Sequence, residues 1–163
     1  MTAPAAALLD SNVVVAILSE AHEHHQASLT LLTGADPARY AISAHSYAEA
    51  YSTLTRCGDR APFQFSAEEA WAALASLRAA TILVGLTPAQ AFDVVRAYSA
   101  SGGIGPRLYD ALIGRAAIVY SIPMIVTWNL GHMRGLFPDI GVVTPSAFMA
   151  QQPEPTRSLR PPT

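Results

Sequence analysis

A three-residue apolar run, Ala7–Leu9, ends at a single acid, Asp10, and a second apolar run begins just after Asn12. The first run is too short and too apolar to face water on either side, so it predicts a buried strand. Residues 12–18 predict a helix that has Asp10 or Ser11 as its N-cap. Because ligands and catalytic groups collect at the carboxyl ends of strands in open α/β sheets, Asp10 stands where a functional group is expected.

The rest of the chain alternates short apolar strands with longer helical patterns. Further strands are expected at residues 40–42, 81–84, 123–127 and 142–143. Helices are expected at residues 22–32, 43–55, 66–79, 87–100, 107–120, 131–136 and 145–150. Ser66 and Glu69 have the spacing of a capping box. This alternation predicts a three-layer α/β fold with a mainly parallel sheet of about five short strands flanked by helices.

A chain of 163 residues is long enough for one domain with a substantial core. We assign residues 1–150 to that domain. Residues 151–163 contain four prolines and almost nothing apolar, so we expect a disordered Pro-rich tail.

The composition limits the classes of protein to which this chain can belong. Apolar residues make up 51% and charged residues 13% of the chain, which predicts an apolar surface covered by a partner. The apolar stretch 111–126 is interrupted by Gly114, Arg115, Ser121 and Pro123, so we expect no membrane span. Absence of a basic, apolar leader argues against a signal peptide, and a lone cysteine fits a cytoplasmic protein.

Charge and residue usage exclude other classes. The net charge of −2 argues against a generally basic nucleic-acid binder. All ten basic residues are arginine, which excludes a phosphate-binding P-loop, since that loop needs its lysine.

Four polar residues stand where they could form a site, and each also has an ordinary explanation. Asp10 could be only a helix cap, and Glu49 only a solvated residue on a polar helix face. Asp110 could complement a helix N-terminus, but its helix is almost wholly apolar, and a buried charge needs a partner or a metal. Asn129 follows a strand, where asparagine commonly serves a turn.

Considered together, these positions favour a metal site. Asp10, Asn129 and the start of the helix that carries Asp110 could share one edge of a parallel sheet. Carboxylate and amide oxygens suit a hard cation such as Mg²⁺ or Mn²⁺. Such a cation can activate water and stabilise the leaving oxygen of a phosphodiester.

The order and context of these residues resemble the PIN-domain ribonucleases, and within them the VapC-type toxins of bacterial toxin–antitoxin pairs. The matching pieces are Leu-Leu-Asp-Ser-Asn (8–12), Ala-Glu (48–49), Tyr-Asp-Ala-Leu-Ile (109–113) and Val-Thr-Trp-Asn-Leu-Gly-His (126–132). The resemblance covers roughly residues 5–150 and implies a PIN-like fold.

The resemblance implies an endoribonuclease that uses Mg²⁺ or Mn²⁺ and hydrolyses RNA phosphodiesters. Asp10, Glu49 and Asp110 would be the acidic ligands, and Asn129 stands where the family often has aspartate. That substitution removes one negative charge and should weaken a second metal more than the first. As a toxin the protein would bind a cognate antitoxin, and its apolar composition predicts a homodimer.

RNA contacts are weakly indicated at four further positions. Arg107 and Arg115 could bind phosphates, Thr127 could orient water or a phosphate, and Trp128 could stack on a base. Two other functions fit the same residues: a non-catalytic PIN-like scaffold that binds protein or RNA, and a metal-dependent DNA nuclease.

Overall fold

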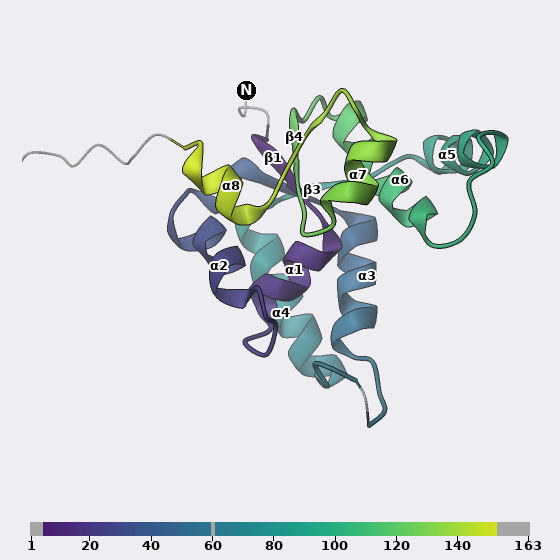
Figure 1. The fold of residues 1–163 in the computed structure, drawn as a ribbon. Coiled ribbons are helices and arrows are strands. Elements are labelled where there is room, and N and C mark those ends of the chain that lie inside the picture. The colour runs from purple at the N-terminus through teal and green to yellow at the C-terminus, as the bar shows by residue number, and fades with distance from the viewer. Residues whose placement is uncertain (1–4, 60, 153–163) are drawn as a thin grey trace, which may run out of the picture.

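The computed structural model describes residues 5–59 and 61–152. Its five strands form one parallel sheet in the order β3-β2-β1-β4-β5 (Figure 1). The strands are β1 (Ala7–Leu9), β2 (Tyr40–Ser43), β3 (Ile82–Val84), β4 (Met124–Val126) and β5 (Gly141–Val143). Within the described ranges no helix has the length and apolar character of a membrane span.

The described residues also form eight α-helices and one short 3₁₀ helix, of which all but the last, α8, connect two strands. They are α1 (Ser11–Leu18), α2 (His25–Thr33), η1 (Pro37–Arg39), α3 (Ala44–Leu54), α4 (Ala67–Ala80), α5 (Pro88–Ala100), α6 (Arg107–Val119), α7 (Leu130–Leu136) and α8 (Pro145–Ala150).

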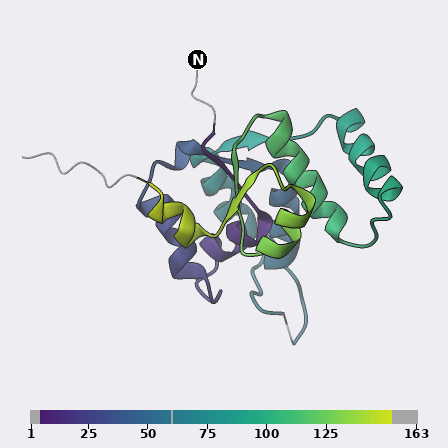
Figure 2. The same cartoon turned by 45° about the horizontal axis from the view of Figure 1, so that its top comes forward.

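The central strand β1 is buried on both faces, and its residues alternate between two apolar cores. Ala7 and Leu9 pack into a core formed with α1, α2, α3, α4 and α8. Leu8 packs into the opposite core, together with residues of α6 and α7. The two cores show that helices cover both faces of the sheet, which confirms the predicted three-layer α/β fold. Helix α5 lies outside α6, at the edge of the molecule (Figures 1 and 2).

Several helices begin directly after a residue whose side chain caps them. The Asp10 side chain caps α1 and accepts from the Ser11 amide. Ser66 and Glu69 form the predicted capping box at the start of α4, and Thr87 forms another with Gln90 at α5. These caps satisfy backbone N–H groups that would otherwise lack partners in the first turn, so local sequence fixes where these helices begin.

The second helix begins later than predicted, at His25 instead of residue 22. The ring of His24 stacks on Trp128, with ring centres 3.9 Å apart. The ring nitrogen Nδ1 of His22 accepts a hydrogen bond from the His24 amide. These contacts stabilise a turn where the sequence alone favours helix.

The last helix of the described residues, α8, ends at Ala150, and the assignment of residues 1–150 to one domain stays a prediction. Gln152 still contacts the domain, since its side-chain oxygen accepts a hydrogen bond from Arg39. The rest of the predicted Pro-rich tail lies outside the described residues.

Candidate active site

The site lies at the carboxyl ends of β1 and β4, where the strand order reverses from one side of β1 to the other. This reversal is the usual ligand position in open α/β sheets. Asp10 follows β1, and Thr127 follows the neighbouring β4. The amide of Asp10 donates to the carbonyl of Val126 at 3.0 Å, so the backbone brings the two strand ends together.

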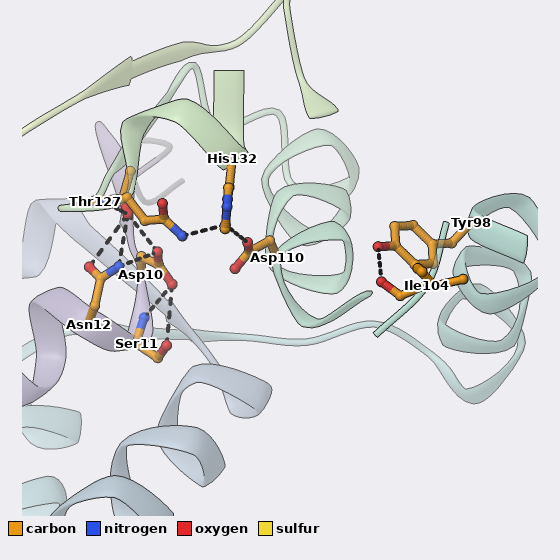
Figure 3. A network of polar contacts seen from close by, with 9 residues as sticks. Asp10, Ser11, Asn12, Tyr98, Ile104, Asp110, Thr127 and His132 are labelled. Atoms are coloured by element: carbon orange, nitrogen blue, oxygen red, sulfur yellow. Dashed lines mark hydrogen bonds and ion pairs between the residues drawn. The ribbon is translucent and has the colours of Figure 1, made fainter. Parts of the chain in front are cut away.

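Asp10 is 2% exposed, and donors hold both oxygens of its carboxylate (Figure 3). Oδ1 accepts from the Ser11 amide at 2.6 Å. Oδ2 accepts from the Thr127 hydroxyl at 2.6 Å and from the Asn12 side-chain amide at 2.9 Å. Burial raises the pKa of Asp10, the hydrogen bond from Thr127 opposes that rise, and the nearby charge of Asp110 adds to it. Asp10 is therefore both a helix cap and a buried carboxylate with a fixed orientation.

Thr127 connects Asp10 to Asn129. Its hydroxyl, which donates to Asp10, accepts hydrogen bonds from the Asn129 amide at 2.9 Å and the Asn12 side chain at 3.1 Å. Thr127 is completely buried, so it orients the site's other groups and has no surface for RNA. The Asn129 side chain contacts the ring of His132, with Nδ2 and Nδ1 2.8 Å apart.

Glu49 projects from α3, and its side chain is 27% exposed. Burial raises the pKa of Glu49, and the charges of Asp10 and Asp110 raise it further, while the Ser11 hydroxyl opposes the rise. Its Oε2 is shielded from water and has no hydrogen-bond partner. The nearest ring nitrogen, Nε2 of His45, is 3.7 Å away, too far for a hydrogen bond. A shielded carboxylate oxygen without a donor is costly and is available to a cation.

Asp110 lies in the first turn of α6, as predicted. Burial raises the pKa of Asp110, and His132 and Arg107 oppose that rise. Nδ1 of His132 lies 3.5 Å from Oδ2 of Asp110 (Figure 3). Asp110 can both complement the positive end of the α6 dipole and serve as a metal ligand, because its carboxylate faces the other acids.

The structure thus brings the three acids close enough that Asp110 raises the pKa of Asp10, and that Asp10 and Asp110 both raise the pKa of Glu49. Oxygen donors, like-charge repulsion and the unpaired Glu49 oxygen all fit a hard divalent cation. Among residues 5–59 and 61–152, no three His, Cys, Asp or Glu side chains form a ready-made metal cluster. The donor set fits a cation, but it is not a preformed cage.

The four predicted RNA-contact residues lie in different environments. Thr127 is buried, as described above, and the other three differ from one another. Arg107 is exposed and near enough to Asp110 to lower the pKa of that acid. Arg115 instead lines a cavity of about 460 Å³ that lies between α5 and α6. The Trp128 ring stacks on His24 and donates to the Ser28 hydroxyl at 2.9 Å, so packing explains it.

Asn12 and His132 belong to the polar network but were not predicted as site residues. Asn12 donates to Asp10 and accepts from the Trp128 amide at 3.1 Å. Its position two residues after a strand-ending acid is the signal that could have identified it. His132 bridges Asn129 and Asp110, and its spacing of three residues from Asn129 could have indicated a shared helix face.

Comparison with known proteins identifies a family. The family model of the PIN domain matches residues 7–131. No curated protein sequence matches the chain.

Several solved structures share the fold. VapC20 of Mycobacterium tuberculosis, described as a sarcin–ricin loop cleaving toxin, is 16% identical with a TM-score of 0.57, covering 73% of this chain and 86% of its own. FitAcB from Neisseria gonorrhoeae is 18% identical with a TM-score of 0.57, covering 85% and 97%. DNA-bound VapBC from Salmonella typhimurium is 19% identical with a TM-score of 0.58, covering 85% and 96%.

Proposed function

The chain belongs to the PIN domain family, and from that premise we propose that it is a metal-dependent endoribonuclease. The observation that carries this proposal is the meeting of three carboxylates, Asp10, Glu49 and Asp110, whose pKa values are all raised at the end of the parallel sheet. Stability alone does not explain such an arrangement, because buried like charges repel one another. A cation offsets that repulsion.

The residues that would hold Mg²⁺ or Mn²⁺ are Asp10, Glu49 and Asp110, with Asn129 as a neutral fourth candidate. When bound, the cation supplies positive charge that stabilises phosphoryl oxygens and makes water easier to ionise. Thr127 and Asn12 hold Asp10 in one orientation through hydrogen bonds of 2.6 and 2.9 Å. Arg107, exposed beside Asp110, is placed to bind a phosphate of the RNA.

We further propose that the protein is a toxin and that a cognate antitoxin and a second copy of the chain cover its apolar surfaces. One such surface is a groove of about 620 Å³ between α3, α4 and β3. It is lined by Tyr51, Trp71 and Leu83, which are 37%, 68% and 45% exposed. Exposed apolar area of this kind marks interaction sites. Measuring the molecular mass in solution, with and without co-expressed antitoxin, tests for the antitoxin complex and for the homodimer.

The test of the activity is cleavage of a mixed RNA pool with Mg²⁺ or Mn²⁺, with EDTA as the metal-free control. We expect the wild type to cleave RNA and Asp110→Asn to lose at least about a hundredfold in rate, as the removal of one catalytic electrostatic group commonly does. Asp93→Asn is the matched control, since Asp93 is exposed on α5 and pairs with Arg96.

Single-stranded DNA of matched sequence distinguishes an RNase from a DNA nuclease. Metal-dependent cleavage of RNA that is lost only in Asp110→Asn supports the proposal. An inert wild type that binds no Mn²⁺ would instead favour the non-catalytic scaffold.

A further inference from the structure

One face of α6 carries basic residues that lead away from the candidate cation site. Arg107, Ala111 and Arg115 follow one another at intervals of four residues, so they lie on the same face of the helix. Arg107 is near enough to Asp110 to lower the pKa of that acid, whereas Arg115 lies farther along α6. Both arginines are exposed, and the small side chain of Ala111 leaves the surface between them open.

The same face of α6 forms one wall of the cavity of about 460 Å³ between α5 and α6. Ala111 and Arg115 line this cavity from α6, and Arg96 and Tyr98 line it from α5. The hydroxyl of Tyr98 donates to the carbonyl of Ile104 at 3.1 Å (Figure 3), which ties α5 to the loop that joins the two helices. The cavity is therefore a recess with arginines on both walls, and we call it the basic recess.

The protein neutralises only part of the positive charge in the basic recess. Arg96 pairs with Asp93 at 2.9 Å. Within residues 5–59 and 61–152, no ion pair involves Arg107 or Arg115. The net charge of the chain is −2, so a generally basic composition does not explain these arginines. Guanidinium groups that lack a carboxylate partner favour an anionic ligand such as phosphate.

The spacing of the arginines indicates a polymer of phosphates. A rise of about 1.5 Å per residue puts Arg107 and Arg115 about 12 Å apart along the axis of α6. A distance of this size suits two phosphates of one strand better than a single small anion. Single-stranded nucleic acids bind in grooves that combine basic residues with aromatic rings, and Tyr98 and Phe137 both line the basic recess.

The groove between α3, α4 and β3 has a different chemistry. Tyr51, Trp71 and Leu83 line it together with one basic residue, Arg78. The guanidinium of Arg78 already donates to the carbonyl of Thr81 at 3.2 Å, so apolar area dominates that groove. Apolar area suits a protein partner, whereas the basic recess suits RNA.

We propose that the basic recess binds single-stranded RNA that runs along α6 from the candidate cation site. Arg107 contacts a phosphate beside that site, and Arg115, assisted by Arg96, contacts a phosphate farther along the same strand. This inference rests on the proposed nuclease activity and adds a path for its substrate. Contacts to phosphates carry no sequence information, so the path contributes affinity and register, and sequence choice arises elsewhere.

The test is binding of a fluorescent, mixed-sequence single-stranded RNA to the full chain, measured over a range of salt concentrations. EDTA is present so that metal-dependent cleavage does not shorten the RNA. We expect Arg115→Gln to reduce the slope of log K against log salt by about 0.7, the value for one phosphate contact of a single strand, and to weaken binding about fivefold to tenfold at low salt.

Two variants serve as controls. Arg115→Lys keeps the charge and should retain most of the slope. Arg39→Gln should change neither slope nor affinity, because Arg39 is exposed and precedes β2 at the opposite edge of the sheet from the site.

Chemical protection provides the second readout and needs no variant. Phenylglyoxal modifies exposed arginines, and mass spectrometry identifies the modified positions. RNA should protect Arg107 and Arg115 and leave Arg39 reactive. An unchanged salt slope in Arg115→Gln, or an Arg115 that RNA does not protect, overturns the path and leaves the nuclease proposal standing.

Two further outcomes separate the proposals. A wild-type dimer that Arg115→Gln dissociates without changing RNA binding would assign the recess to a second copy of the chain and overturn the path. RNA that protects Arg115 but is never cut when Mg²⁺ or Mn²⁺ is added supports the path and overturns the nuclease proposal.

Discussion

The hydroxyl of Thr127 donates a 2.6 Å hydrogen bond to Oδ2 of Asp10, across 117 residues of sequence and two adjacent parallel strands. The hydroxyl oxygen of Thr127 also accepts a hydrogen bond from the backbone amide of Asn129. One buried hydroxyl thus fixes the positions of two candidate ligands.

Removing this hydroxyl should therefore affect both stability and metal binding. Thr127→Val keeps the volume but deprives Asp10 of a donor and the Asn129 amide of its acceptor, so we expect a loss of about 1–3 kcal/mol in the free energy of unfolding. Urea denaturation measures this change. Thr127→Ser keeps the hydroxyl and is the control, and equal stability of the two variants would contradict the assigned role.

Removing a carboxylate should stabilise the metal-free protein while weakening metal binding. Glu49→Gln removes one of three mutually repelling charges and retains the side-chain shape, so we expect a gain of up to about 1 kcal/mol near neutral pH in EDTA. Mn²⁺ affinity should fall in the same variant. Thermal melts with EDTA and with Mn²⁺ measure both effects, and Glu68→Gln, exposed on α4, should change neither.

The pH dependence of stability follows from the raised pKa values of Asp10, Glu49 and Asp110. A carboxyl whose pKa is higher in the folded than in the unfolded state contributes stability below its ordinary pKa, near 4, and loses it as pH rises through the folded value. In EDTA, the wild type should therefore lose more stability between about pH 4 and about pH 7 than Asp110→Asn does.

The wild type and Asp110→Asn must be compared at each pH because burial lowers the pKa of His45. That shift works in the opposite direction: its unfavourable contribution at low pH disappears as pH rises. The histidine is present in both proteins, so its contribution largely cancels in the difference. Denaturant midpoints at each pH provide the measurement. If stability changes with pH by the same amount in the two proteins, the pKa of Asp110 is not raised.

Close packing of α6 against Phe137, the residue that follows α7, predicts a further effect. A Cβ built on Gly114 would lie 2.0 Å from the Phe137 ring, so Gly114→Ala should cost about 1–3 kcal/mol through overpacking. Gly135→Ala is the matched control, because nothing lies within 4 Å of its added Cβ and alanine favours a helix. Thermal unfolding compares the two, and a neutral Gly114→Ala would show that the helices readily move apart.

The sequence predicted what local patterns determine. The apolar triplet Ala7–Leu9 and the Ser66–Glu69 capping box are both present, because each depends on residues close in the chain. The start of α2 was missed because His24 stacks on Trp128, a contact made only after folding. Apolar residues of α3 also end in different environments: Leu54 is buried, whereas Tyr51 lines the exposed groove.

The same distinction applies to the site. Asp10 and Asp110 were recognisable from their apolar surroundings, whereas Glu49 required the family resemblance. The spacing of His132 from Asn129 is visible in the sequence, but its 3.5 Å approach to Asp110 arises only when α6 and α7 come together.

The placement of β1 between β2 and β4 also has a consequence during protein synthesis. The first strand leaves the ribosome early, but the hydroxyl that holds its terminal acid is made more than a hundred residues later. Until β4 has been translated and has joined the sheet, Asp10 lacks that donor. Until the start of α7 has been translated, the ring of His132 is absent. A nascent chain therefore cannot assemble the site, and any activity that the site confers begins only with the nearly complete domain.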